Sequence, residues 1–189
     1  VFMADWTGYD APIRLEGRLL IADPTLGKGP FHHSVILLTE HSSEEGAFGL
    51  ILNQPSNHHV GDFLEKEEFE ALSTIPVHLG GPVSRENLSF AALWWSESAS
   101  LCFETGISAS GAIKHANTPG VIVRAFLGYS GWSKGQLEGE IRHRSWIPAK
   151  PTEDLLTREH DHSLWSQTLR NLSIYHTIVA ECPEDPGKN

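Results

Sequence analysis

The side chains with the clearest potential for chemistry lie between Gly128 and Ser133, where the sequence reads Gly-Tyr-Ser-Gly-Trp-Ser. A serine on a sharp turn between glycines is typical of the nucleophile elbow, Gly-x-Ser-x-Gly, which presents an activated hydroxyl to a substrate. Here Gly131 follows Ser130 directly and the bulky Trp132 comes next, so the spacing differs from that of the elbow. We therefore assign no catalytic residue, and a hydrolase or transferase that uses Ser130 stays as the alternative hypothesis.

The same segment has the features of a ligand-binding corner. A β-branched run at 121–126 predicts a strand, and Ser133 with Gln136 three residues later is a capping-box pattern for a helix. Strand ends and helix N-termini are common ligand sites, since free backbone N–H groups there attract anions. We expect a binding surface made of Tyr129, Ser130, Gly131, Trp132 and Ser133, joined by Asn53, Gly80 and Gly81 from two other predicted turns.

The predicted helix after Ser133 carries two charged pairs. Glu138 precedes Arg142 and Glu140 precedes Arg144, each at the i,i+4 spacing and in the favourable order. We predict that both pairs are solvated ion pairs that support the helix.

Glycines at two places indicate close approach of another group. Gly135 and Gly139 each cost about 1 kcal/mol relative to alanine in a helix interior, so either something contacts the backbone there or the helix tolerates them. Gly80 and Gly81 end an apolar run, and their lack of a side chain could admit a ligand or another strand.

Histidines are numerous, and two adjacent pairs stand at 32–33 and 58–59. Neighbouring residues of an extended strand point to opposite faces, and the sequence lacks the His-Glu-x-x-His or paired-cysteine spacing of metal sites. We therefore predict no metal and no cofactor. His41 lies in a predicted polar turn, where it is either solvated or an acid–base partner that folding brings near Ser130.

Charge and composition argue against several classes of protein. The chain has 24 acidic and 14 basic residues, a formal charge of -10, which repels polyanions. The densest basic cluster, residues 142–144, is small, so we expect no direct nucleic-acid binding. No apolar run of about 18 residues could cross a bilayer, and the acidic first residues do not resemble a secretory signal. We therefore expect a cytoplasmic protein that acts through a protein partner or a small ligand.

Hydrophobic patterns predict strands interspersed with helices, which is typical of a mixed α/β fold with helices packed on a mixed sheet. The predicted strands are 17–22, 34–39, 46–52, 77–79, 88–95, 101–103, 121–126, 145–148 and 174–180. The predicted helices are an acidic amphipathic one at 61–72, then 108–116, the capped helix after residue 133, a short one at 154–157, and a last one around 165–172. We predict a single domain over 1–189, with an N-terminal arm at 1–14 and a tail at 182–189.

Motifs spread along most of the chain also resemble those of a known family. They are Leu19-Leu20-Ile21-Ala22 with Pro24, Phe31 with Ser34-Val35, Glu40-His41, Gly46-Ala47 with Gly49, Asn53 with Pro55, Gly80-Gly81-Pro82-Val83, the segment from Gly128 to Trp132, Gly135-Gln136-Leu137-Glu138, and Trp146. In order and number they resemble the YqgE/AlgH family. The chain departs from the usual pattern at His32-His33, where a basic residue commonly precedes Ser-Val.

The resemblance implies a bacterial cytoplasmic protein with a highly curved, mostly antiparallel mixed sheet that closes almost into a barrel, with helices outside. It implies no established catalytic activity, although some members carry the label of transcriptional regulator. Our leading hypothesis is therefore a non-enzymatic binding or regulatory protein.

Overall fold

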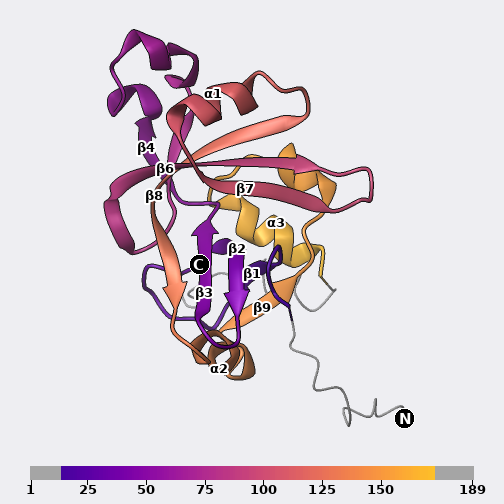
Figure 1. Ribbon diagram of the computed structural model, residues 1–189. Helices are drawn as coiled ribbons and strands as arrows, with labels where there is room; N and C mark the ends of the chain where they lie inside the picture. The colour runs from indigo at the N-terminus through magenta and orange to yellow at the C-terminus, as the bar shows by residue number, and fades with distance from the viewer. Residues whose placement is uncertain (1–13, 173–189) are drawn as a thin grey trace, which may run out of the picture.

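The computed structural model describes residues 14–172 and contains a mixed α/β fold in which strands predominate (Figure 1). The predicted strand at 174–180 and the predicted tail lie outside the described residues, as does the predicted arm except for Arg14. The strands are β1 (Leu19–Ala22), β2 (Val35–Ser42), β3 (Gly46–Ile51), β4 (Pro55–His59), β5 (Pro76–Leu79), β6 (Val83–Trp95), β7 (Leu101–Ile107), β8 (Val121–Trp132) and β9 (Trp146–Ala149). The helices are α1 (Ala109–Ala116), α2 (Gln136–Arg142) and α3 (Ser163–Arg170), with 3-10 turns η1 (Val60–Asp62), η2 (Glu67–Leu72) and η3 (Glu153–Leu156).

The strands follow one hydrogen-bonded path in the order β4-β5-β8-β3-β2-β1-β9, and β6 and β7 branch from β8. Within the described residues every pairing is antiparallel except that of β5 with β8, which confirms a mostly antiparallel mixed sheet. Over the same residues β4, β7 and β9 each pair on one side only, so hydrogen bonds do not close the sheet. The barrel-like closure that the resemblance implied is wrong.

The curvature of the sheet is concentrated in β8, which serves two sets of neighbours. Its first part pairs with β5 and β6, and its end pairs with β3, where Ala47 lies opposite Trp132. Between them Gly128 has φ 70°, and a Cβ at that position would lie 2.5 Å from the carbonyl oxygen of Val83. The residues from Gly128 to Trp132 are therefore strand, where the sequence predicted a loop.

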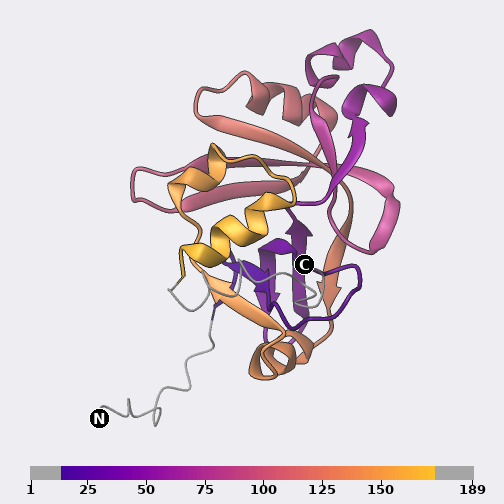
Figure 2. The same cartoon turned by 180° about the vertical axis from the view of Figure 1, so that it is seen from behind.

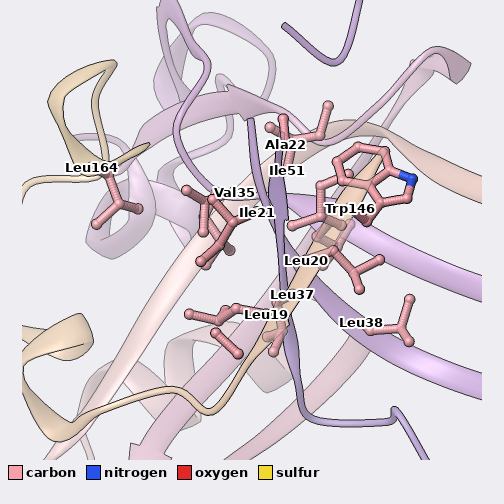
Figure 3. Packing of buried hydrophobic residues seen from close by; sticks show 14 of the residues in the cluster. Leu19, Leu20, Ile21, Ala22, Val35, Leu37, Leu38, Ile51, Trp146 and Leu164 are labelled. Carbon is pink, nitrogen blue, oxygen red and sulfur yellow. The ribbon is translucent and has the colours of Figure 1, made fainter. Parts of the chain in front are cut away.

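The larger core lies among β1, β2, β3 and the helices that cover them (Figure 3). Leu20, Ile36 and Leu38 are completely buried, as expected for near-continuous apolar strands covered on both faces. Helix α3 crosses these strands in the view from behind (Figure 2), and the indole N–H of Trp165 donates to the carbonyl of Ala22 at 2.8 Å. The predicted last helix is thus confirmed.

A second, smaller core lies under α1 and η2 and contains Val60, Leu72 and Phe90. The acidic helix expected at 61–72 is instead two separate 3-10 turns. The reason is visible in one hydrogen bond, from Gly61 N–H to the Ser73 carbonyl at 3.0 Å. In a straight α-helix each residue adds about 1.5 Å of length, so residues 61 and 73 would lie too far apart for that contact.

The predicted helix at 108–116 is α1, whose Ser108 hydroxyl accepts a hydrogen bond from Gly111 N–H at 3.1 Å. This is the N-cap interaction that its sequence favours. The short predicted helix at 154–157 is the 3-10 turn η3. No helix in the described part of the chain is long and apolar enough to span a membrane.

Candidate functional site

An open cavity of about 610 Å³ is lined in part by α2. This helix lies at the end of the molecule opposite α1 (Figure 1). Its walls come from the segment that precedes β1, from the end of β2 and the turn after it, from α2, and from β9. The lining residues are Arg14, Leu15, Arg18, His41, Ser43, Glu138, Ile141, Arg142 and Pro148. Most of these positions are far apart in the sequence, so the cavity is a product of the tertiary fold.

Helix α2 is fixed in place by a carboxylate that two tryptophans share. The indole N–H groups of Trp132 and Trp146 both donate to Glu140 Oε2, at 2.8 and 2.7 Å. Both tryptophans are buried, and so is Leu137 on the inner face of the helix. Hydrogen bonds to an ionised group are stronger than neutral ones, so this contact gives a short helix a defined position.

Helical periodicity then determines which side chains of α2 reach the cavity. Glu138, Ile141 and Arg142 are three and four residues apart and therefore share one face of the helix. All three line the cavity. Because Glu140 is held from the other side, the charged groups of Glu138 and Arg142 are presented to the cavity.

The start of α2 differs from the capping box that the sequence predicted. The N–H of Ser133 donates to Gln136 Oε1 at 3.0 Å, as in a capping box, but the helix begins only at Gln136. Gly135 precedes it in a left-handed conformation, with φ 73°. No atom of a neighbouring element lies within 4 Å of a Cβ built at Gly135 or Gly139, so the close approach considered for these glycines does not occur.

His41 and Glu138 form a hydrogen-bonded pair in the cavity wall. The Nε2 of His41 lies 2.9 Å from Glu138 Oε1, and the backbone N–H of Leu15 donates to His41 Nδ1 over 3.5 Å. Since Nδ1 accepts, the neutral ring carries its proton on Nε2 and donates it to the carboxylate. The ring is 7% exposed and the Glu138 side chain 32% exposed, so the carboxylate is the more accessible partner.

Three guanidinium groups line the same cavity without a partner. The side chains of Arg14, Arg18 and Arg142 make no ion pair or hydrogen bond with any residue of the 14–172 stretch. Among the described lining residues, Glu138 is the one carboxylate. The cavity wall is therefore cationic, although the protein as a whole is strongly acidic.

The ion pairs expected along the helix do not form. Glu138 contacts His41, not Arg142, and Glu140 contacts the two tryptophans and the Gln136 amide, not Arg144. The reason is tertiary, because β2, β8 and β9 bring His41, Trp132 and Trp146 against α2. Arg142 is thereby left free to face the cavity.

Ser130 is completely buried and donates its hydroxyl proton to the carbonyl of Gly80 at 3.1 Å. Its neighbour across the sheet is Gly49 of β3. A nucleophile has to reach a substrate and pass its proton to a base. His41, named as a partner for that chemistry, bonds to Glu138, so the structure gives the Ser130 hypothesis no support.

Gly80 and Gly81 are buried where the end of β5 crosses β8. A Cβ at Gly80 would lie 2.3 Å from the Gly128 carbonyl oxygen, and one at Gly81 would lie 2.2 Å from the backbone of Tyr129. Of the two possibilities left open by the sequence, it is another strand that approaches these glycines.

Asn53 and Trp132, two further residues of the expected binding surface, are buried. The Asn53 amide accepts from Val35 N–H at 2.8 Å and donates to the His33 carbonyl at 2.9 Å, which ties the loop before β2 to the end of β3. The indole N–H of Trp132 is hydrogen-bonded to the Glu140 carboxylate. Both side chains thus have defined structural contacts.

Tyr129, Gly131 and Ser133 retain access to solvent. The Tyr129 ring lies 5.5 Å from that of Phe48, a large apolar side chain that is 41% exposed. That these residues bind a ligand or a partner stays a prediction.

The histidine pairs considered as metal ligands have other neighbours. The rings of His32 and His33 stack at 3.9 Å, and His33 stacks on Trp165 at 3.7 Å. His58 Nδ1 lies 3.4 Å from an Asp62 carboxylate oxygen. Within residues 14–172 no three histidine, cysteine, aspartate or glutamate side chains gather in a way that could hold a metal ion.

Sequence reasoning did not find the arginines of the cavity. Arg14 was placed in an arm, Arg142 in a solvated helix pair, and Arg18 at the start of a strand. His41 was noticed, but it belongs to β2, not to a turn, and its partner Glu138 is 97 residues away. No local spacing connects these residues, so only the fold could assemble them.

Comparison with known proteins shows clear relatives. A family model described as AlgH-like matches residues 19–177. A UPF0301 protein from Bacteroides fragilis is 33% identical over 180 residues, covering 92% of this chain and 90% of the relative. Another from Chlorobium limicola is 34% identical over 181 residues, covering 92% and 95%.

Two solved structures share the fold. A crystal structure of a Corynebacterium diphtheriae protein superposes with a TM-score of 0.70 at 22% identity, over 92% of this chain and 95% of that one. The solution structure of the AlgH protein from Pseudomonas aeruginosa gives 0.64 at 22% identity, over 95% and 100%.

Proposed function

The chain belongs to the AlgH-like family, and since the names of its relatives assign no activity, we propose from the geometry that it binds a small organic anion in the arginine-lined cavity. The observation that carries this proposal is the convergence of Arg14, Arg18 and Arg142 on one open cavity, where none of them has a carboxylate partner in the described part of the chain. This narrows the hypothesis of a non-enzymatic binding or regulatory protein to one site and one class of ligand.

The charges of the cavity favour an anion. Guanidinium groups bind carboxylates and phosphates through paired N–H donors, and such charge-assisted hydrogen bonds are stronger than neutral ones. An anion in the cavity supplies the partner that Arg18 and Arg142 lack among residues 14–172. We therefore expect the charged end of the ligand at these arginines.

The remaining lining favours a ligand that also has an apolar part. Leu15, Ile141 and Pro148 contribute apolar surface between the charged groups. A volume of about 610 Å³ lies within the range of small-molecule sites, which combine an apolar wall with a few polar groups that fix orientation. A bare inorganic ion would leave most of this space unused.

The His41–Glu138 pair gives the cavity a second, different end. The Glu138 carboxylate repels an anion and accepts hydrogen bonds, and His41 holds it in one orientation. We expect this end to accept a hydroxyl or amine of the ligand. The ligand is therefore an anion with a polar, uncharged or cationic group at its far end.

The net charge of the protein restricts the size of the anion. With a formal charge of -10 the protein as a whole repels nucleic acids and other polyanions. A small anion can reach the arginines without meeting much of that surface. The proposal is therefore of a small molecule, with direct nucleic-acid binding disfavoured.

Isothermal titration calorimetry with phenyl phosphate, inorganic phosphate and phenol tests this proposal. Phenyl phosphate carries both the anion and an apolar body, so it should bind more tightly than either of the other probes. The double substitution Arg18→Met and Arg142→Met keeps the aliphatic stems and removes the charges, and should weaken phenyl phosphate binding at least about tenfold.

Arg144→Met is the matched control. Arg144 is exposed and follows α2, but it does not line the cavity, so its substitution should leave the affinity unchanged. The proposal fails if phenyl phosphate and phenol bind equally, or if the double variant binds phenyl phosphate as the wild type does.

A further inference from the structure

Two buried imidazoles hold the segment around η3 against the sheet. Neither of them lines the arginine cavity. His78 of β5 is 4% exposed and His160 is 5% exposed. His78 Nε2 lies 2.7 Å from the carbonyl oxygen of His160, and His160 Nε2 lies 2.9 Å from that of Leu155. A carbonyl oxygen can only accept, so Nε2 carries the proton in both rings and each neutral ring has a lone pair on Nδ1.

Three buried nitrogen atoms in this region have no hydrogen-bond partner among the described residues. They are Nδ1 of His78, Nδ1 of His160 and Nε of Arg124. Buried polar atoms are nearly always satisfied, and an unsatisfied group in a native protein commonly marks an ordered water or an ion. The unpaired set is chemically complementary, since it comprises two acceptors and one donor.

The three side chains lie on the same side of the sheet. The two imidazole ring centroids are 6.4 Å apart. His78 pairs in register with Phe126, and their rings are 6.2 Å apart. Arg124 is two residues before Phe126 on β8, so its side chain shares that face.

Both histidines are neutral at neutral pH. Burial and, to a smaller extent, the positive charge of Arg124 together lower the pKa of His160 to about 4. The pKa of His78 is lowered by burial, and again by Arg124. The other charged group that acts here is Glu159, whose carboxylate favours the charged guanidinium of Arg124.

We propose that one buried water molecule joins the three nitrogens, accepting from the Arg124 Nε–H and donating to Nδ1 of both His78 and His160. A water has two protons to donate and lone pairs to accept with, so it satisfies all three atoms at once. Buried waters typically make about three hydrogen bonds, the number available here.

A metal ion is the competing occupant, and the charges disfavour it. Metal-bound histidines often donate their other ring N–H to a backbone carbonyl, as both of these do. However, the guanidinium of Arg124 is close enough to affect both imidazoles, and it would repel a cation. The water instead uses Arg124 as its donor.

The water is a structural bridge in this proposal. His160 follows η3, and its ring and carbonyl connect that segment to β5. With the water in place, Arg124 of β8 becomes the third anchor of the same segment. The bridge therefore connects two strands of the sheet to the chain that covers them.

A high-resolution crystal structure of the full chain at neutral pH, with elemental analysis of the same sample, tests the proposal. The expected result is a peak with the electron count of water within hydrogen-bond distance of all three nitrogens. A peak with an anomalous metal signal, no peak, or imidazoles turned so that their Nδ1 atoms bond to protein groups would overturn it.

Imidazole ¹⁵N chemical shifts provide a second measurement that does not depend on crystals. In the wild type, Nδ1 of both histidines should show the shift of a hydrogen-bonded, unprotonated nitrogen. Arg124→Met should move both shifts toward the unbonded value, whereas Arg144→Met should leave them unchanged. If Arg124→Met does not fold, the wild-type shifts and the crystal structure still decide, and wild-type shifts of non-bonded Nδ1 atoms would contradict the proposal.

Discussion

The crossing of β5 with β8 and the cavity beside α2 differ in what their polar groups contact. At the crossing, Ser130 and Gly80 are buried and bonded to each other. At the cavity, Arg18 and Arg142 stand at an open surface with no partner in the described chain. A satisfied buried group stabilises the fold, whereas an unpaired charge in a cavity is available to a ligand.

This difference shows why a motif alone misleads about function. The glycines and serine at the crossing resemble a ligand loop in sequence. In the structure, however, these glycines allow two backbone segments to pack against each other. The cavity has no motif, yet its three arginines have no side-chain partner among the described residues.

Gly80→Ala should lower the free energy of unfolding by more than about 4 kcal/mol, the range reached by severe steric substitutions. The new Cβ would lie 2.3 Å from the Gly128 carbonyl oxygen, and a backbone atom cannot move aside cheaply. Urea denaturation followed by tryptophan fluorescence measures the change.

Gly139→Ala is the matched control, since no atom of a neighbouring element lies within 4 Å of its Cβ. It should be neutral or stabilising by up to about 1 kcal/mol, because alanine favours a helix interior. Near-equal stability of Gly80→Ala and the wild type would show that the crossing is not tightly packed.

Acidification should destabilise the fold through His160, which lies near the crossing. Its pKa is about 4 in the folded chain against an ordinary 6.5, so the unfolded chain binds a proton at higher pH. The folding stability that depends on neutral His160 is therefore fully present above about pH 6.5. It is lost as the pH falls toward 4, by about 3 kcal/mol in total. Urea midpoints measured across this range would show the loss.

His160→Gln should reduce that pH dependence, because glutamine does not titrate, and the remaining slope should come in part from His78, whose pKa is also lowered by burial. The same substitution at the exposed His59 should leave the slope as in the wild type. If His160→Gln retains the full wild-type slope, the pH dependence does not come from His160.

Ser130→Ala should cost about 1 kcal/mol of stability, the typical value of one buried hydrogen bond. The loss is modest because the Gly80 carbonyl keeps its bond from Ile51 N–H at 2.9 Å. Phenyl phosphate affinity, measured by calorimetry, should not change. Loss of binding in this variant would place Ser130 in the functional site and remove the contrast between the two regions.

Glu138→Gln should strengthen phenyl phosphate binding about threefold, or roughly 0.6 kcal/mol, because it removes the negative charge from the cavity. The glutamine oxygen can still accept from His41 Nε2–H, so the wall keeps its shape. Calorimetric titration of the variant beside the wild type provides the comparison. Weaker binding would mean that the carboxylate itself contacts the ligand.

Local patterns predicted most of the strands and all three α-helices of the described residues. The apolar runs at 34–39 and 46–52 are β2 and β3, and the Ser108 cap begins α1, because burial and capping depend on neighbouring residues. The helix at 61–72 failed because hydrogen bonds between its two ends outweigh its periodicity. The length of β8 was missed because its glycines favour turns locally while its partner strands hold it extended.

The acidic balance, the mixed α/β class, most element positions and the family can be read from composition and short-range pattern. The open sheet, the burial of Ser130 and the shared cavity of Arg14, Arg18 and Arg142 follow from the folded chain and not from local sequence. The physical reason is that burial and charge pairing depend on contacts between residues distant in the chain, as the bond from His41 to Glu138 across 97 positions demonstrates.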